Sequence, residues 1–165
     1  MMPDELPETP GRAGVVATTI ALHAAGFPGP IPRSGSSMNL ISFFAVGFGA
    51  FIGAVMRWLL GLALNPILPA LPLGTLAANL IGGLVMGLAL GFFAHYEALP
   101  IAWRLAITTG FLGGLTTFSA FSGETVTLFL RQQYGWTAAI VAAHLFGSLV
   151  LTLAGIGIAR LILRT

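Results

Sequence analysis

Apolar residues dominate the chain from residue 39 onward, in four long segments separated by short polar or proline-containing stretches. The segments cover residues 39–64, 73–94, 101–130 and 136–159. Each reaches the roughly 20 apolar residues that a helix needs to cross a hydrocarbon core of ~30 Å. The short connections predict two antiparallel helical hairpins, with both ends of this part of the chain on one side of a membrane. The predicted fold class is therefore an all-α integral membrane protein with four transmembrane helices.

The third segment, 101–130, is too long for one straight crossing. As a straight helix it would run ~45 Å, about half as long again as the hydrocarbon core. We expect it to tilt strongly or to break at Gly113-Gly114, which Thr116-Thr117 follow closely. Unwound backbone at membrane depth survives only where protein or an ion satisfies it. A simple glycine kink at a tight helix crossing is the alternative.

Composition supports a membrane protein, because 56% of the 165 residues are hydrophobic and only 7% are charged. A soluble domain carries about 25% charged residues. The chain has no cysteine, which excludes a disulfide, a thiolate metal site and a thiol nucleophile. The net charge of +2 is too small and scattered to indicate nucleic-acid binding. No hydrolase elbow, P-loop, dinucleotide fingerprint or zinc motif occurs, so we do not expect an enzyme.

Residues 1–37 differ sharply in composition from the rest. They hold six of the ten prolines and three of the five acidic residues, and they end in a run rich in serine and glycine. This composition predicts a disordered N-terminal extension, or a mis-assigned start with Met38 as the true first residue. We favour the second interpretation. Residues 38–165 then form a single four-helix transmembrane domain.

The stretch from Thr108 to Ser122 combines glycines, hydroxyl side chains and phenyl rings inside a predicted span. Glycine frees the backbone from the helix, oxygen atoms suit a cation, and positive phenyl edges can face an anion. Phe118 and Phe121 share a helix face, and Ser119 forms a similar pair with Ser122. Because such chemistry is costly in lipid, the stretch predicts an ion site. A plain packing surface is the alternative for the phenylalanine pair.

Further polar residues in the predicted spans could carry chemistry. Asn79, one turn after Thr75, could donate to an anion or bond a neighbouring helix. Glu124 is the only acid inside a predicted span, so we expect it to be protonated, paired or in contact with water. Arg57 either extends to the interface or makes the mouth of an anion path positive.

Regular spacing of polar and small residues marks other helix faces. His144, Ser148 and Thr152 are four apart, which fits either a hydrogen-bonded packing stripe or a polar pathway. Small residues at the spacing of close helix contacts allow packing within or between subunits. These are Gly49, Gly53, Gly83, Gly87, Gly91, Gly147 and Gly155.

The arginines favour no orientation in the membrane. With Met38 as the start, Arg104, Arg160 and Arg164 fall on the terminal side and Arg57 and Arg131 on the other. The positive-inside rule then barely distinguishes the two sides. Either one arginine suffices, or Arg57 acts locally, or the chain inserts both ways and pairs as an antiparallel dual-topology homodimer. Such a dimer would be an inverted repeat made from two copies.

Three segments resemble the CrcB/Fluc family of fluoride channels: residues 49–58, residues 72–82, and residues 108–122 with Glu124. The resemblance covers residues 38–160. It implies a four-helix channel domain, a dual-topology homodimer with two antiparallel fluoride pores, and a place in the inner membrane of a bacterium. It also implies passive export of fluoride that entered the cell as neutral HF.

The resemblance implies roles for particular residues. Backbone carbonyls of Gly113 and Thr116 from both subunits would hold a structural sodium ion (Na+) at the dimer centre. Asn79, Phe118 and Phe121 match pore-lining positions, while His144 stands where family members carry serine or asparagine. The full predicted fluoride-pore set is Arg57, Thr75, Asn79, Phe118, Ser119, Phe121, Ser122, Glu124, His144 and Ser148.

A small dual-topology multidrug or cation exporter is the alternative function. Such exporters need a membrane carboxylate on the first helix to exchange protons for substrate, and here that helix has only Arg57. A non-transporting assembly subunit is a third possibility that rests on the glycine spacing alone. Liposome flux separates the three.

Overall fold

The computed structural model describes residues 39–68 and 71–163, so the predictions for residues 1–37 lie outside the described residues. It contains four segments long and apolar enough to cross a membrane. They are α2 (Leu40–Leu64), α3 (Leu73–His95), the composite segment Ile101–Leu130 and α7 (Tyr134–Leu163). A short 3-10 turn, η1 (Asn65–Ile67), extends α2. The four predicted spans are confirmed, although α7 is longer than expected at both ends.

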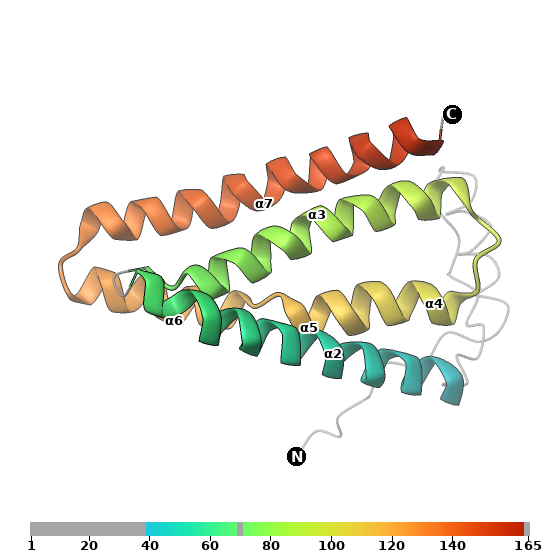
Figure 1. Cartoon of the computed structure of the whole chain (residues 1–165), viewed down its shortest axis with the longest axis horizontal. Helices are drawn as coiled ribbons and strands as arrows, with labels where there is room; N and C mark the ends of the chain where they lie inside the picture. The colour runs from blue at the N-terminus through green and yellow to red at the C-terminus, as the bar shows by residue number, and fades with distance from the viewer. Residues whose placement is uncertain (1–38, 69–70, 164–165) are drawn as a thin grey trace, which may run out of the picture. The chain divides into compact units, whose positions relative to one another are not determined.

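Successive spans alternate in direction. Figure 1 shows the start of α2 and the end of α7 at one end of the helical unit, with the connections that follow α2 and precede α7 at the other. The connection between α3 and the third span lies at the same end as the start of α2 and the end of α7. The predicted pair of antiparallel hairpins is therefore confirmed.

The third span is a chain of unlike helical pieces. It runs through α4 (Ile101–Leu105), the π-helical η2 (Ala106–Leu112), α5 (Gly113–Leu115) and α6 (Phe118–Leu130). The helix breaks between α5 and α6.

The break lies slightly later than the glycine pair. Thr116 (φ −83°, ψ 155°) and Thr117 (φ −152°, ψ 115°) are extended, whereas Gly113 keeps helical angles. The predicted break at Gly113-Gly114 followed by Thr116-Thr117 is therefore confirmed, and its extended residues are the two threonines. The π-helical turns before it were not predicted. Such turns often occur at functional sites because they displace backbone groups from the regular ladder.

Glycine brings α2 into direct backbone contact with the first half of the third span. A Cβ atom added to Gly53 would collide with the backbone of Phe111, and one added to Gly114 would collide with the carbonyl of Ala50. Each helix therefore presents glycine where the other presents main chain. This contact lies within one chain.

The same device joins α3 to α7. A Cβ on Gly87 would overlap the carbonyl of Thr152, and a Cβ on Gly155 would overlap that of Leu84. The glycine spacing on both helices thus serves close packing inside the chain.

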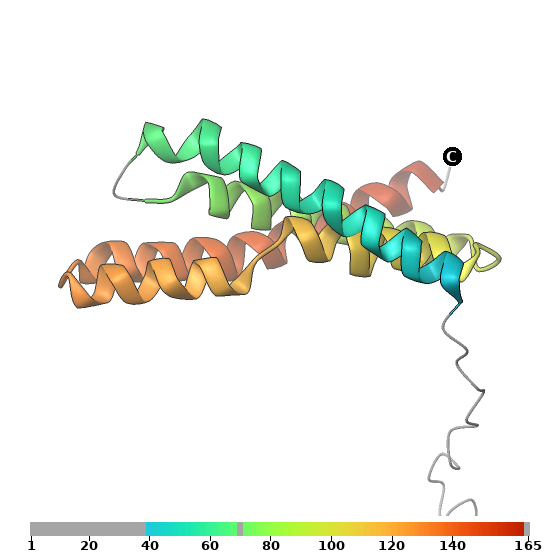
Figure 2. The ribbon, with the colours of Figure 1, turned by 90° about the horizontal axis from the view of Figure 1, so that it is seen from below.

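The break changes the packing partner of the third span. Its first half contacts α2, whereas α6 contacts α7 and, less extensively, α3. Figure 2 shows α6 beside α7 and apart from the end of α2. Cavities lined by Thr117 lie on both sides of the break.

Candidate functional site

The break is held from the α3 side by the amide of Asn79. Its Oδ1 accepts from the backbone N–H of Thr117 at 2.8 Å, and its Nδ2 donates to the carbonyl of the same residue at 3.2 Å. The side chain thus takes the place of a neighbouring strand for one extended residue. Because Thr117 N–H needs an acceptor, the oxygen of the amide must face it. Asn79 was predicted either to donate to an anion or to bond a neighbouring helix. The structure shows the second, with Thr117 as the partner.

The second hydrogen of the Asn79 amide leads to His144 on α7. Asn79 Nδ2 lies 3.0 Å from His144 Nδ1. An amide nitrogen only donates, so Nδ1 accepts and the proton of a neutral imidazole lies on Nε2. Both hydrogens of the Asn79 amide are then engaged. Asn79 reaches an anion only by releasing Thr117 or His144.

His144 is the most deeply buried polar side chain near the break. It is 5% exposed, and its Nε2 is buried without a hydrogen-bond partner among the described residues. Its ring lies 4.6 Å from that of Phe121 between centroids, tilted by 31°. A buried N–H donor without an acceptor is costly, so this site favours an anion or a water molecule.

The two phenylalanines of α6 have different surroundings. Their ring centroids are 5.6 Å apart, with planes at 59°. Phe121 is half-buried against His144, whereas Phe118 is 80% exposed. Phe118 therefore projects from this chain toward whatever surrounds it.

Glu124 on α6 pairs with Thr75 on α3. The Thr75 hydroxyl donates to Glu124 Oε1 at 2.5 Å. The other carboxyl oxygen, Oε2, is buried without a partner in the described part of the chain. The contact joins α3 to α6 on the side of Asn79 nearer the start of α3.

Seven of the ten predicted pore residues line one of two cavities, and Thr117 lines both cavities. One, of about 520 Å³, is lined by Asn79, Gly113, Thr116, Thr117, Phe118, Phe121, His144 and Ser148, among others. The other, of about 550 Å³, is lined by Arg57, Thr75, Thr117 and Ala120, with α2 residues near its end. Ser119, Ser122 and Glu124 line neither cavity. Ser119 instead contacts the Thr117 hydroxyl at 3.1 Å.

The backbone at the break offers oxygen atoms to a cation. In a continuous helix the carbonyl of Gly113 would accept from Thr117 N–H, and that of Thr116 from Ala120 N–H. Here Thr117 N–H donates to Asn79, and Ala120 N–H donates to the Thr117 hydroxyl at 3.2 Å. Both carbonyls therefore lose their helical donors. The pair fits the hard oxygen ligands that sodium prefers.

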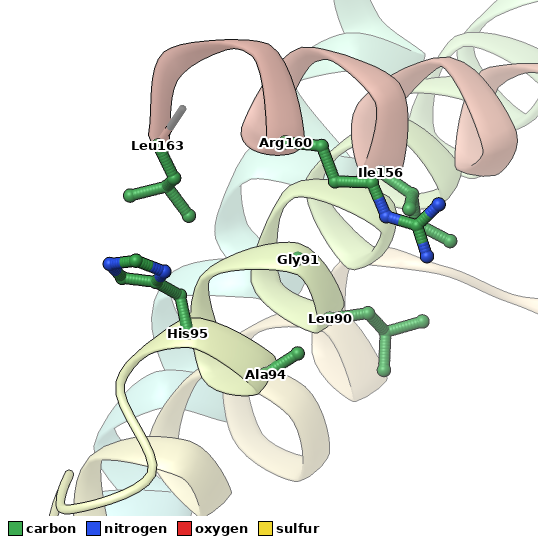
Figure 3. Close-up of a pocket in the computed structure, with 7 residues that line it drawn as sticks. All are labelled: Leu90, Gly91, Ala94, His95, Ile156, Arg160 and Leu163. Atoms are coloured by element: carbon green, nitrogen blue, oxygen red, sulfur yellow. The ribbon is translucent and has the colours of Figure 1, made fainter. Parts of the chain in front are cut away.

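A third cavity lies between the far ends of α3 and α7. It has a volume of about 330 Å³, and Figure 3 shows His95 of α3 and Arg160 of α7 facing it with Gly91 between them. Its other walls are apolar. No residue of the predicted pore set lies there.

Sequence reasoning missed the role of Thr117 and the contact of Arg57 with the Gly114 carbonyl, at 3.0 Å from Nε. Thr117 lies inside the stretch singled out from the sequence, but its partner Asn79 is 38 residues away. No local pattern connects the two. The loss of helical hydrogen bonds at the break is the signal that demands such partners.

Residues 44–156 match the family described as CrcB-like protein, Camphor Resistance (CrcB). The fluoride-specific ion channel FluC of Nitrosospira multiformis is 58% identical over 119 residues, which are 72% of this chain and 93% of that protein. The protein of the same name from Pseudomonas paraeruginosa is 51% identical over 70% of this chain and 91% of its own length. That of Tolumonas auensis is 50% identical over 76% of this chain and 99% of its own length.

Proposed function

The chain belongs to the CrcB-like family, and from that premise we propose that it is a fluoride-specific ion channel of a bacterial membrane. The observation that carries this proposal is 58% identity over 93% of a relative named as such a channel. A cavity that Asn79, His144 and Ser148 help to line, within a helical unit of four apolar spans, supports it. Flow down the fluoride gradient would then export the ion passively.

The cavity beside the break offers fluoride several weak ligands. His144 Nε2–H is buried and unpaired within the described chain, and the hydroxyl of Ser148 lies one helical turn further along α7. Ring edges of Phe118 and Phe121 add weak positive potential. Fluoride is strongly hydrated, so donors must replace its water without trapping it. We propose that the residues lining this cavity form the part of the pore wall that one chain contributes.

We propose an antiparallel dual-topology homodimer, and Gly113 supports it. A Cβ at Gly113 would meet only the carbonyl of Thr108, at 4.0 Å, so packing within the chain does not require glycine there. Phe118 is 80% exposed beside the same cavity. A second copy across this face explains both the glycine and the exposed ring.

We also propose that the Gly113 and Thr116 carbonyls of both chains bind one structural sodium ion. The diverted N–H groups of Thr117 and Ala120 leave these oxygens available. Two such breaks facing each other would bring four carbonyls together with no donor between them. A cation there supplies charge compensation and holds the two chains together.

The multidrug-exporter alternative has less support. No carboxylate lies on α2, and Glu124 is bonded to Thr75. An exporter of that kind would have to exchange protons through a group that this geometry already pairs.

Fluoride efflux from liposomes that hold the purified protein tests the proposal. Vesicles loaded with fluoride should release it rapidly when an ionophore balances the charge, and chloride-loaded vesicles should not release chloride. Proton-coupled uptake of a cationic drug, or no flux at all, would reject the channel in favour of the exporter or the assembly subunit.

A further inference from the structure

We infer that Arg57 fixes the geometry of the helix break by binding the Gly114 carbonyl, and that this donor matters more than its positive charge. Arg57 lies on α2, and its Nε donates to the Gly114 oxygen at 3.0 Å across 57 residues of sequence. The inference rests on the proposed function only where fluoride flux is the measurement.

The Gly114 carbonyl needs a donor because the helix ends beyond it. Its helical partner would be the N–H of Phe118, the first residue of α6. The extended residues Thr116 and Thr117 separate the two. A carbonyl left unpaired here would be costly, since no water is present in the membrane interior. Arg57 replaces the missing N–H.

The sequence of α2 places Arg57 where it can do this. Ala50, Gly53 and Arg57 follow one another at intervals of three and four, so they share a helix face. Gly53 and Gly114 let the two backbones touch, because a Cβ on either would overlap the other helix. Arg57 lies one helical turn after Gly53, where the two backbones touch. Its guanidinium is therefore close to the backbone of the third span.

Arg57 and Asn79 hold the break from opposite helices. Asn79 of α3 binds both backbone groups of Thr117, and Arg57 of α2 binds Gly114. Of the two carbonyls proposed for sodium, that of Thr116 lies between these contacts, and that of Gly113 lies on the peptide just before Gly114. Their orientation is thus set by two side chains that are not themselves ligands.

The positive charge of Arg57 contributes less directly than its N–H donor at the helix break. A guanidinium near a cation site repels the cation, so its charge works against sodium binding. Arg57 also lines the cavity of about 550 Å³, where a positive charge could attract anions. The donor and the charge therefore predict different outcomes for different substitutions.

Three substitutions separate the two roles. Arg57→Gln keeps an N–H donor at the same number of bonds from the backbone and removes the charge. Arg57→Met removes both, and Arg57→Lys keeps the charge but moves the donor one bond further out. We expect Arg57→Gln to keep at least half of the wild-type fluoride flux and Arg57→Met to lose at least tenfold. We also expect Arg57→Met to need more sodium for half-maximal flux.

Hydrogen exchange of backbone amides gives a readout that does not depend on fluoride. Amides around residues 114–118 should exchange at least tenfold faster in Arg57→Met than in the wild type, and Arg57→Gln should resemble the wild type. Arg131→Met, which removes an exposed arginine after α6, is the control and should change neither exchange nor flux. If Arg57→Met fails to fold, the flux and amide exchange of Arg57→Gln can be compared with those of Arg57→Lys. That comparison still distinguishes a role of the donor from a role of the charge.

Two results would overturn the inference. One is wild-type exchange at the break in Arg57→Met. The other is equal loss in Arg57→Gln and Arg57→Met with full activity in Arg57→Lys, which would make Arg57 an electrostatic residue. A wild-type protein that conducts no fluoride would reject the proposed function, and the exchange measurements would still test Arg57.

Discussion

At the scale of single residues, Asn79 connects three elements with one amide. It joins α3 to the extended backbone of the break through Thr117, and to α7 through His144. A leucine of similar size would leave the N–H of Thr117 and the Nδ1 of His144 without partners. Each unsatisfied buried group costs about 1–3 kcal/mol.

We therefore expect Asn79→Leu to abolish fluoride flux and to lower stability as well. Thermal unfolding in detergent, followed by light scattering or tryptophan fluorescence, would measure the second effect. Asn79→Asp keeps the acceptor for Thr117 and should be milder in stability. A variant Asn79→Leu with wild-type melting would show that the amide does not support the break.

The phenylalanine rings make a separate prediction. Replacing Phe118 or Phe121 by isoleucine keeps apolar bulk but removes the ring quadrupole. We expect each variant to lose at least tenfold in fluoride flux while the dimer stays intact by size-exclusion chromatography. Phe129→Ile is the matched control, because Phe129 is an exposed ring of the same helix that contacts Tyr134 instead. Unchanged flux in both the Phe118 and the Phe121 variant would show that the two rings serve only as a packing surface.

These side-chain contacts were largely beyond the reach of sequence reasoning. The residue types were found, since hydroxyls, rings and an amide in an apolar span are conspicuous. Their pairing was not, because Asn79 and His144 lie 65 residues apart and meet only through the packing of α3 on α7. The engagement of both amide hydrogens of Asn79 follows from that packing alone.

At the scale of elements, the third span departs furthest from a regular helix. Length alone predicted that it could not cross straight, and the break is confirmed. Its place at Thr116-Thr117 depends on partners from other helices, Arg57 and Asn79, which supply the bonds that the helix gives up. Local propensity favoured the glycines and could not detect those partners.

Gly113 tests what lies across the break. Within one chain a valine would fit there, because only the Thr108 carbonyl comes as near as 4.0 Å. In the proposed dimer the same valine would crowd the axis where two breaks meet. We expect Gly113→Val to fold but to lose dimerisation and at least tenfold in flux, as size-exclusion chromatography and efflux would report.

The matched control for this variant is Gly123→Val, since a Cβ at Gly123 on α6 also meets nothing within 4 Å. It should assemble and conduct as the wild type does. A Gly113→Val protein that remains dimeric and active would place the subunit contact elsewhere.

Removal of sodium is a prediction about the same element. Exchange of all sodium for a large organic cation should abolish fluoride flux, because the carbonyls of Gly113 and Thr116 from two chains would face each other without a cation. Flux should not depend on the direction of a sodium gradient, since an ion on the dimer axis lies outside both pores. Full activity after rigorous sodium removal would refute the structural ion. Flux driven by a sodium gradient would refute it equally.

At the scale of the whole molecule, the four apolar spans and their alternating directions were predictable from hydrophobic pattern alone. The pattern does not specify which spans pair. Close contact of α2 with the third span and of α3 with α7 depends on glycines whose neighbours the sequence does not identify. The proposed partner chain is likewise not specified by the pattern, and the balance of arginines counted from Met38 is the sequence feature from which it was predicted.

That balance gives the last prediction. Positive charge on a short terminal segment keeps it on the cytoplasmic side, so the nearly even distribution of arginines counted from Met38 would leave both orientations accessible. Several lysines added after Thr165 should bias insertion to one orientation and deplete the partner needed for an antiparallel dimer. Fluoride resistance of cells that express only this variant should fall. Co-expression with an oppositely biased variant, carrying lysines in the connection between α6 and α7, should restore it. Reporter fusions that show a single orientation for the unmodified chain, or full activity of the biased variant alone, would exclude dual topology.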